Sequence, residues 1–197
     1  YTNVLNMLSL ADMPLYAKDR GEDFPIVVGG GPCTYNAEPL CGFFDVFSIG
    51  EGEEALCEMT RLYIDMKKDG SYNKNDFLRR LSHIEGFYVP SLYEVEYNAD
   101  GTVKSYTPKY PDVPSKIRKR IIKNMDAVPF PEKFVMPYIE TVHNRITEEV
   151  YRGCIRGCRF CQAGFIYRPF REKNVDTITN QTKCLCEQTG YEEVSLS

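Results

Sequence analysis

Histidine, positive charge and long apolar segments are all scarce in this chain. Of its 197 residues only two are histidine, and acidic residues outnumber basic ones, which gives a net charge of −4. A protein of this charge is poorly suited to a polyanion as its main partner. No apolar run approaches the ~20 residues that cross a bilayer, and no secretory signal begins the chain. These absences predict a soluble cytoplasmic protein without a membrane partner.

Cysteine, by contrast, is abundant, with eight residues. A disulfide framework would suit a small secreted domain, but the length of the chain and the lack of an export signal favour a reducing compartment. Cys33, Cys41 and Cys57 are scattered among apolar neighbours, and we expect small buried side chains at these positions. The remaining cysteines lie in the last quarter of the chain.

The first 86 residues alternate between strand and helix patterns, which is typical of a parallel α/β sheet. The strand patterns are short apolar runs, each followed by a glycine-rich turn. The predicted elements are, in order, a helix ended by Pro14, strands over 24–28 and 43–49, a helix over 55–66 ended by Gly70, and a helix over 76–84 closed by Gly86. We expect residues 1–86 to form part of one domain.

The pattern changes over residues 87–140. Alternating residues over 92–96 and 103–106 flank a turn, which predicts a β-hairpin. Half of the twelve prolines then fall within 108–137, and such a stretch favours an extended linker. A basic run over 116–123 lies in this linker. Its isoleucines favour a short amphipathic helix with the charges in solvent, and contact with RNA phosphates is the alternative.

Residues 141–197 read as one strand–loop–helix–strand unit. Strands are predicted over 145–151 and 193–197, and a helix over 176–188 that ends at Gly190. This is the first βα unit of a barrel-like sheet, in which reactive groups lie at the C-terminal ends of strands. The chain begins without Met in a helical pattern and stops within a strand pattern, so we expect it to be an internal fragment.

A loop with three cysteines directly follows the first of these strands. Cys154, Cys158 and Cys161 have the spacing C-x3-C-x2-C. Three thiolates on one loop can hold three corners of a [4Fe–4S] cube and leave one iron without a protein ligand. An open metal position is typical of a catalytic site rather than a structural one. The spacing therefore favours an open, reactive cluster.

Two other metal sites remain as alternatives. A structural zinc site or a closed electron-transfer cluster would need a fourth ligand, and Cys184 or Cys186 is the candidate. These two cysteines lie two positions apart on a predicted helix, so they point in different directions. Neither His83 nor His143 has a usual zinc-motif spacing from the loop cysteines.

The charge pattern of the loop fits an anionic group. Five arginines and no acidic residue occur between the first and last of them, at positions 152, 156, 159, 168 and 171. Guanidinium groups offset the negative charge of a thiolate-bound cluster and can bind a carboxylate through two hydrogen bonds. A plain basic surface is the alternative for any single arginine.

This loop, with Phe160 just before its last cysteine, resembles that of the radical S-adenosylmethionine (SAM) enzymes. The resemblance implies that Cys154, Cys158 and Cys161 hold a [4Fe–4S] cluster and that Phe160 helps to place the adenine of SAM. It implies reductive cleavage of SAM to a 5′-deoxyadenosyl radical that acts on an unknown substrate, and some enzymes of the family modify RNA or protein. An electron donor such as flavodoxin or ferredoxin is implied as a partner.

The resemblance extends beyond the cysteine loop. Residues 152–169, 28–32 and 45–53 resemble a branch of uncharacterised bacterial radical SAM proteins, in which a Rossmann-type, B12-binding-like domain precedes a partial TIM barrel. It implies that the chain holds the second half of the first domain and the first βα unit of the second. Gly29, Gly30 and Gly31 would then lie near the nucleotide tail of a cobalamin. A tight turn that requires positive φ is the alternative for these glycines.

Overall fold

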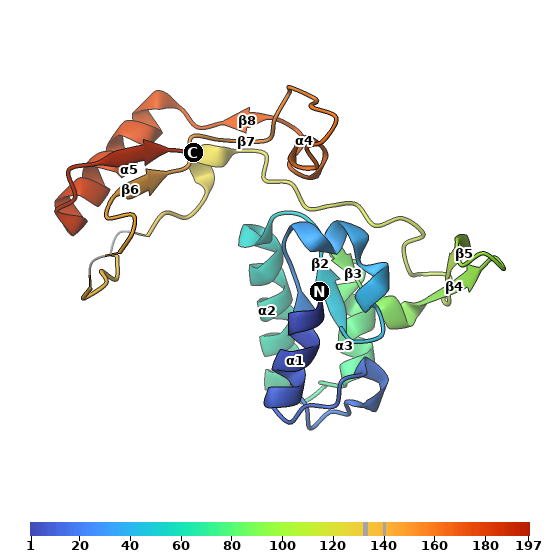
Figure 1. Cartoon of the computed structure of the whole chain (residues 1–197). Coiled ribbons are helices and arrows are strands. Elements are labelled where there is room, and N and C mark those ends of the chain that lie inside the picture. The colour runs from blue at the N-terminus through green and yellow to red at the C-terminus, as the bar shows by residue number, and fades with distance from the viewer. Residues whose placement is uncertain (132–133, 140) are drawn as a thin grey trace. The chain divides into compact units, whose positions relative to one another are not determined.

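A computed structural model describes residues 1–131, 134–139 and 141–197. The chain divides into two compact units, Tyr1–Ile121 and Ile122–Ser197 (Figure 1). The division falls inside the proline-rich segment 108–137. Each unit is α/β and, among the described residues, contains two small sheets.

The larger sheet of the first unit is mixed. Strand β2 (Val46–Ser48) lies between β1 (Val28–Gly29) and β3 (Phe87–Tyr88), parallel to the former and antiparallel to the latter. The β1–β2 pair is parallel as predicted, but the antiparallel β3 makes the sheet mixed rather than wholly parallel. Both strands are shorter than predicted, and β1 begins at the last residue of the expected range. The antiparallel β3 was not predicted, because two residues are too short to show a period.

Helices α1 (Thr2–Leu10), α2 (Gly52–Lys68) and α3 (Lys74–Leu81) accompany this sheet (Figure 1). Helix α2 begins with two acidic residues and ends with two lysines, which matches the helix dipole at both ends. The side chain of Asn73 caps α3 by accepting from the backbone N–H groups of Asn75 and Asp76. These three helices confirm the predicted ones within a few residues at each end.

The core of this unit is rich in aromatic residues. Phe47, Phe77 and Phe87 are almost completely buried, and Leu81 and Val89 pack with them in one cluster. Each aromatic side chain removes a large apolar area from water, so such a small sheet still gains a core. Short 3₁₀ helices connect these elements: η1 (Ala17–Asp19), η2 (Pro32–Asn36), η3 (Glu38–Leu40) and η4 (Pro90–Leu92).

The predicted hairpin is present as β4 (Tyr93–Tyr97) and β5 (Val103–Pro108). It packs onto the core through three tyrosines. The rings of Tyr93 and Tyr106 stack with centroids 4.6 Å apart, and both lie next to Tyr88 of β3. The hairpin therefore belongs to the first unit.

The basic run does not form the expected amphipathic helix. Residues 116–123 are extended, and Arg120 forms a parallel bridge with Gly50. Its guanidinium donates to Glu54 and Glu58 of α2, with shortest distances of 2.5 Å and 2.6 Å. One charge of the run is thus paired on the domain surface rather than free in solvent. The local sequence pattern could not predict this pairing, because the two glutamates lie on α2, more than 60 positions earlier in the chain.

The second unit contains the predicted βα unit. Strands β6 (Ile146–Glu148) and β9 (Val194–Leu196) are parallel, and α5 (Val175–Thr189) lies between them in the chain and packs on β6. Gly190 ends α5 in the left-handed conformation with φ 71°, as glycine at this position usually does. The 3₁₀ helix η5 (Met125–Ala127) lies near the start of the unit.

The strand expected over 145–151 is interrupted. After β6 the chain turns into a separate short strand, β7 (Tyr151–Arg152), which pairs with β8 (Arg171–Glu172) in the antiparallel direction. A short helix, α4 (Ala163–Ile166), lies between β7 and β8 (Figure 1). The cysteine loop therefore leaves the βα unit through β7 and rejoins it through β8. We call this pair of strands the neck of the loop.

Two of the isolated cysteines differ from the expectation. Cys33 and Cys57 are exposed, and Cys41 is half-buried. Their apolar neighbours in sequence lie on helices and turns, where adjacent residues face different directions. None of the helices in the described part of the chain is both long and apolar enough to cross a bilayer.

Candidate functional site

The cysteine loop is anchored where β6 ends. The backbone N–H of Val150 donates to Ser197 at 2.8 Å, and that of Lys173 donates to Val150 at 2.9 Å. Ser197 in turn donates to Glu148 at 2.9 Å. The residues just before and just after the loop are thus bonded to each other and to the end of β9. This fixes the loop at the C-terminal ends of the parallel strands, which is where barrel folds place reactive groups.

Gly153 makes the neck of the loop possible. Its φ is 97°, and a Cβ at this position would lie 2.7 Å from the carbonyl oxygen of Pro169 and 2.8 Å from the Cα of Phe170. Both conditions require glycine. The outgoing chain therefore passes directly against the returning backbone. Gly157, inside the loop, also has a positive φ of 66°, but no atom would lie within 4 Å of an added Cβ.

The three loop cysteines are accessible to different degrees. Cys158 is exposed, whereas Cys154 and Cys161 are half-buried, and all are free thiols. The backbone N–H of Cys161 donates to the carbonyl of Cys158 at 3.1 Å, which places these two in one turn. Within the described residues, no three His, Cys, Asp or Glu side chains are gathered closely enough to hold a metal ion.

The donor set nevertheless fits an iron–sulfur cluster in its chemistry. Thiolates are the usual ligands of such clusters, and the three thiols lie within eight residues of a loop whose ends are fixed. Gathering them requires only a rearrangement inside the loop, which the flexible Gly157 permits. The predicted assignment of Cys154, Cys158 and Cys161 as ligands stays a prediction.

A buried ion pair lies at the base of the loop. The ammonium of Lys173 is 2.8 Å from Oε1 of Glu148 and donates to Oε1 of Gln181 on α5, also at 2.8 Å. The Glu148 side chain is 1% exposed and that of Lys173 is 6% exposed. The pair links the last residue of β6 to the first residue after β8. Removing one partner of such a pair leaves an uncompensated buried charge.

Sequence reasoning missed this ion pair. Two adjacent acidic residues, Glu148 and Glu149, lie near the end of the predicted strand. Because β6 ends at Glu148, the alternation of inward and outward side chains does not indicate which of the two is buried. The other acid pairs with the loop: Arg152 donates to both carboxylate oxygens of Glu149, at 2.7 Å and 2.9 Å.

The arginines of the loop have different surroundings. Arg152 pairs with Glu149, and Arg171 donates to the carbonyl of Ile122 at 2.6 Å. The guanidinium of Arg168 lies 4.8 Å from the ring centroid of Phe165. Arg156 and Arg159 are exposed between the cysteines. Of the five arginines, Arg156 and Arg159 alone lie between the loop cysteines in the sequence. They are therefore the arginines best placed to offset the charge of a cluster.

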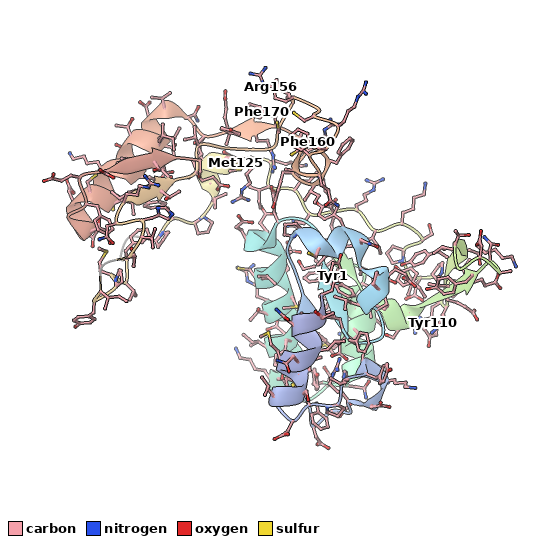
Figure 2. The ribbon with its side chains drawn as sticks, in the orientation of Figure 1. Tyr1, Tyr110, Met125, Arg156, Phe160 and Phe170 are labelled. Atoms are coloured by element: carbon pink, nitrogen blue, oxygen red, sulfur yellow. The ribbon has the colours of Figure 1, made fainter. Side chains whose placement is uncertain are left out.

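Phe160, the residue expected to help place SAM, is 92% exposed. It lies on the loop that also carries Arg156 (Figure 2). Exposed large apolar side chains are concentrated on this loop and next to it: Ile155, Phe160, Phe165, Tyr167 and Phe170. Exposed apolar side chains also occur outside the loop, for example at Val135 and Val142, so exposure alone does not assign a role to Phe160.

The start of α5 is fixed from the other side of the second unit. The backbone N–H of Asn174 donates to Oδ1 of Asp126 at 2.8 Å, and the Asn174 amide bonds the second carboxylate oxygen. The hydrogen bond from the Asn174 backbone is the main reason that the pKa of Asp126 is lowered, followed by one from Thr177. The carboxylate therefore remains charged and holds the residue that precedes the helix.

Cys184 and Cys186 both lie on α5 and are half-buried. His83 is 3.4 Å from Asp112, and the ring of His143 is 3.3 Å from Arg145. In the part of the chain that is described, none of these joins the loop cysteines in a metal-binding group. The same holds for the three loop cysteines themselves, so the choice between three and four protein ligands stays open here.

The glycine turn lies in the first unit, after β1. A Cβ on Gly29 would lie 2.7 Å from the ring of Phe47, and Gly31 has φ 88°. These two positions need glycine for packing and for backbone conformation, as the tight-turn alternative expects. Gly30 has neither constraint. An apolar pocket of about 490 Å³ borders Gly29 and Gly30, with Val4, Leu8 and Phe44 among its lining residues.

Comparisons with known proteins bear on the first unit most directly. The model of a family described as "Radical SAM proteins, N-terminal" matches residues 1–90. The "Uncharacterized protein MJ0966" of Methanocaldococcus jannaschii is 27% identical over 166 residues, which cover 82% of this chain and 29% of that protein. The chain thus spans less than a third of the relative's length. No solved structure matches.

The family match supports a radical SAM protein, and with it an iron–sulfur cluster and SAM as the general cofactors. The matched residues end before the cysteine loop begins, so the match is independent of the cysteine spacing. The B12-binding-like domain, the partial barrel and the roles of single residues stay predictions.

Proposed function

We propose that this chain is part of a radical SAM enzyme whose cluster is held by Cys154, Cys158 and Cys161. The observation that carries this proposal is the coincidence of two independent signals. Three thiols lie on one loop at the end of a parallel strand, and a radical SAM family matches a different part of the chain. When bound, the cluster and SAM supply a 5′-deoxyadenosyl radical that removes a hydrogen atom from a substrate.

The protein's own residues orient and protect these cofactors. The Gly153 neck and the Glu148–Lys173 pair hold the ends of the loop, so that only its interior has to adapt to the cluster. Arg156 and Arg159 supply positive charge among the thiolates. Phe160, exposed next to Cys161, offers an aromatic surface for the adenine of SAM.

The first unit is proposed to be the second half of a B12-binding-like, Rossmann-type domain, and the second unit to begin a partial TIM barrel. The parallel β1–β2 and β6–β9 pairs support this. A cobalamin tail at Gly29, Gly30 and Gly31 is a weaker proposal, supported by the adjacent apolar pocket and opposed by the structural need for two of these glycines. A cytoplasmic flavodoxin or ferredoxin is proposed as the electron donor. The substrate is not assigned, and RNA and protein are the two candidate classes.

The proposal is tested on the full-length protein, purified and reconstituted without oxygen. We expect about four irons per chain and an electron paramagnetic resonance (EPR) signal that changes when SAM is added. Cys154→Ala should abolish cluster binding. Cys184→Ala, which changes a cysteine outside the loop, is the matched control and should leave the iron content unchanged.

Two alternatives give different results in the same experiment. A structural zinc site predicts one zinc per chain, a colourless protein and loss of metal in Cys184→Ala or Cys186→Ala. A ferredoxin-like electron carrier predicts a cluster whose EPR signal ignores SAM. Either result would replace the enzyme proposal.

A further inference from the structure

A second polar site lies in the first unit, away from the glycine turn. It is a cleft of about 730 Å³ next to the residues that precede β2. Pockets of this size hold small-molecule ligands. Four cations and two carboxylates line the cleft, which gives it an excess of two positive charges, although the whole chain is acidic. The charged lining residues are Lys18, Arg20, Glu22, Asp45, Lys74 and Lys109.

Three of these residues form a buried cluster. Asp45 is 3.0 Å from the guanidinium of Arg20 and 2.8 Å from the ammonium of Lys74, and all three side chains are less than a tenth exposed. The second acid, Glu22, is engaged elsewhere, since it accepts from the amide of Asn73 and the backbone N–H of Lys74. Two buried cations therefore share one buried carboxylate. A buried charge without a counter-charge is unfavourable.

The hydrogen bonds of the cluster are also incomplete. Arg20 donates through its terminal nitrogens to the carbonyls of Pro14, Leu15 and Phe43 and to Asp45. Its Nε is buried and has no hydrogen-bond partner among the described residues. The Arg20 side chain is 0% exposed, so this nitrogen is closed to the cleft, and Arg20 contributes its charge to the site rather than a donor.

The ammonium of Lys74 shows the same deficit. It reaches Asp45 and donates to the carbonyl of Arg20 at 2.9 Å. These contacts use two of the three N–H bonds of an ammonium group. Lys74 therefore brings both a spare N–H donor and positive charge to the cleft, and the buried Arg20 adds positive charge behind it.

The rim adds further charge and an apolar wall. Lys18 and Lys109 are exposed at the edge of the cleft, and lysine is a common ligand of phosphate as a mobile point charge. Tyr16, Phe44 and Leu78 line the same cleft. The combination offers cations to one end of a ligand and apolar contacts to the other.

We propose that this cleft binds the phosphate group of a small phosphorylated molecule. A phosphate monoester carries close to two negative charges, which matches the excess on the lining. Its oxygens accept from the third N–H of Lys74 and from the ammonium groups of Lys18 and Lys109, and its organic part packs against Tyr16 and Leu78. This site does not depend on the cysteine loop or on the proposed enzyme activity.

The test uses the full-length protein in 0.1 M salt, where charges more than about 10 Å apart are largely screened. Binding of inorganic phosphate, glycerol 3-phosphate and acetate is measured by isothermal titration calorimetry. We expect saturable binding of both phosphates, with glycerol 3-phosphate at least as tight as inorganic phosphate, and acetate about tenfold weaker. Removing a rim charge by Lys18→Gln or Lys109→Gln should weaken binding about two- to fivefold.

Lys104→Gln is the matched control. Lys104 lies on β5 of the same hairpin and pairs with Glu96, but it does not line the cleft. It removes the same charge from a neighbouring surface, and binding should be unchanged. The proposal is overturned if phosphate fails to saturate below about 10 mM, if acetate binds equally well, or if Lys104→Gln weakens binding as much as Lys109→Gln. Weaker binding of glycerol 3-phosphate than of inorganic phosphate would overturn the role of the apolar wall.

Discussion

The neck of the cysteine loop can form because residue 153 is glycine and has no side chain. In Gly153→Ala the new methyl group would lie 2.7 Å from the Pro169 carbonyl oxygen and 2.8 Å from both the Phe170 Cα and the Tyr167 carbonyl oxygen. All three are backbone atoms, so no side chain can turn aside to make room. The backbone on one side of the neck has to move.

The size of the effect follows from two contributions. A non-glycine residue at positive φ costs about 1–2 kcal/mol, and forcing an extra carbon into a packed site costs about 1–3 kcal/mol. We therefore expect Gly153→Ala to destabilise the closed neck by about 2–5 kcal/mol. Gly157→Ala carries only the first contribution, because its added methyl group meets no atom within 4 Å.

Hydrogen exchange measured by mass spectrometry on the full-length protein distinguishes the two variants. Gly153→Ala should speed exchange at β7 and β8 by at least about thirtyfold, the equivalent of 2 kcal/mol, whereas Gly157→Ala, with about 1–2 kcal/mol, should speed it by less and by about thirtyfold at most. Iron retained after anaerobic reconstitution should fall in the same order. Equal exchange at β7 and β8 in both variants would refute the reasoning that close backbone contact holds the neck.

Further changes follow from particular contacts. Lys173→Met leaves the buried Glu148 without its partner and should cost the second unit about 3–5 kcal/mol, measured as lost exchange protection at β6 and β9. The Arg79 hydrogen bond lowers the pKa of Asp112 to about 2, so the stabilisation is complete above pH ~4 and is lost as pH falls towards 2; carboxyl NMR titration measures this. Burial raises the pKa of Cys41 to about 12, so at pH 8 its protonated thiol should react slowly with iodoacetamide.

Each of these predictions has an internal control. Lys183→Met breaks an exposed ion pair with Glu187 on the same helix and should cost less than about 0.5 kcal/mol; an equal loss in both lysine variants would contradict a special role for the buried pair. An Asp112 titration midpoint near 4 would contradict the Arg79 contact. Cys33 and Cys57 are exposed and should be alkylated first, and faster labelling of Cys41 would disprove its protection.

Much of the local structure could be predicted from the sequence, because local chemistry determines it. Helix α5 ends at Gly190 because glycine adopts the left-handed conformation there. Helix α2 has Glu53 and Glu54 in its first turn, where acidic residues are favourable. The parallel β6–β9 pair follows from the strand–helix–strand order. The cysteine loop was placed correctly at the end of the first strand of this unit for the same reason.

The features that escaped prediction depend on contacts between distant residues. The basic run is extended because Arg120 bonds Gly50 and reaches two glutamates of α2, and this outweighs a weak helical pattern. The Glu148–Lys173 pair joins residues 25 positions apart across the loop. The unpaired Arg20 Nε depends on packing that no local pattern describes.

The geometry of α5 also weighs on the choice between an open and a closed metal site. Recruiting Cys184 as a fourth ligand would enlarge the ordered segment from the eight residues 154–161 to 154–184, and the added loop entropy is only about 1 kcal/mol. Entropy alone therefore does not exclude a closed site.

The stronger obstacle is rigidity: Cys184 is held in α5, whose start is tied to Asp126 and whose side faces β6. A thiol on a packed helix cannot approach the loop without moving the βα unit, whereas the three loop thiols can gather within a neck that stays closed. The prediction of three protein ligands rather than four rests on this rigidity of α5, and the iron content of Cys184→Ala tests it.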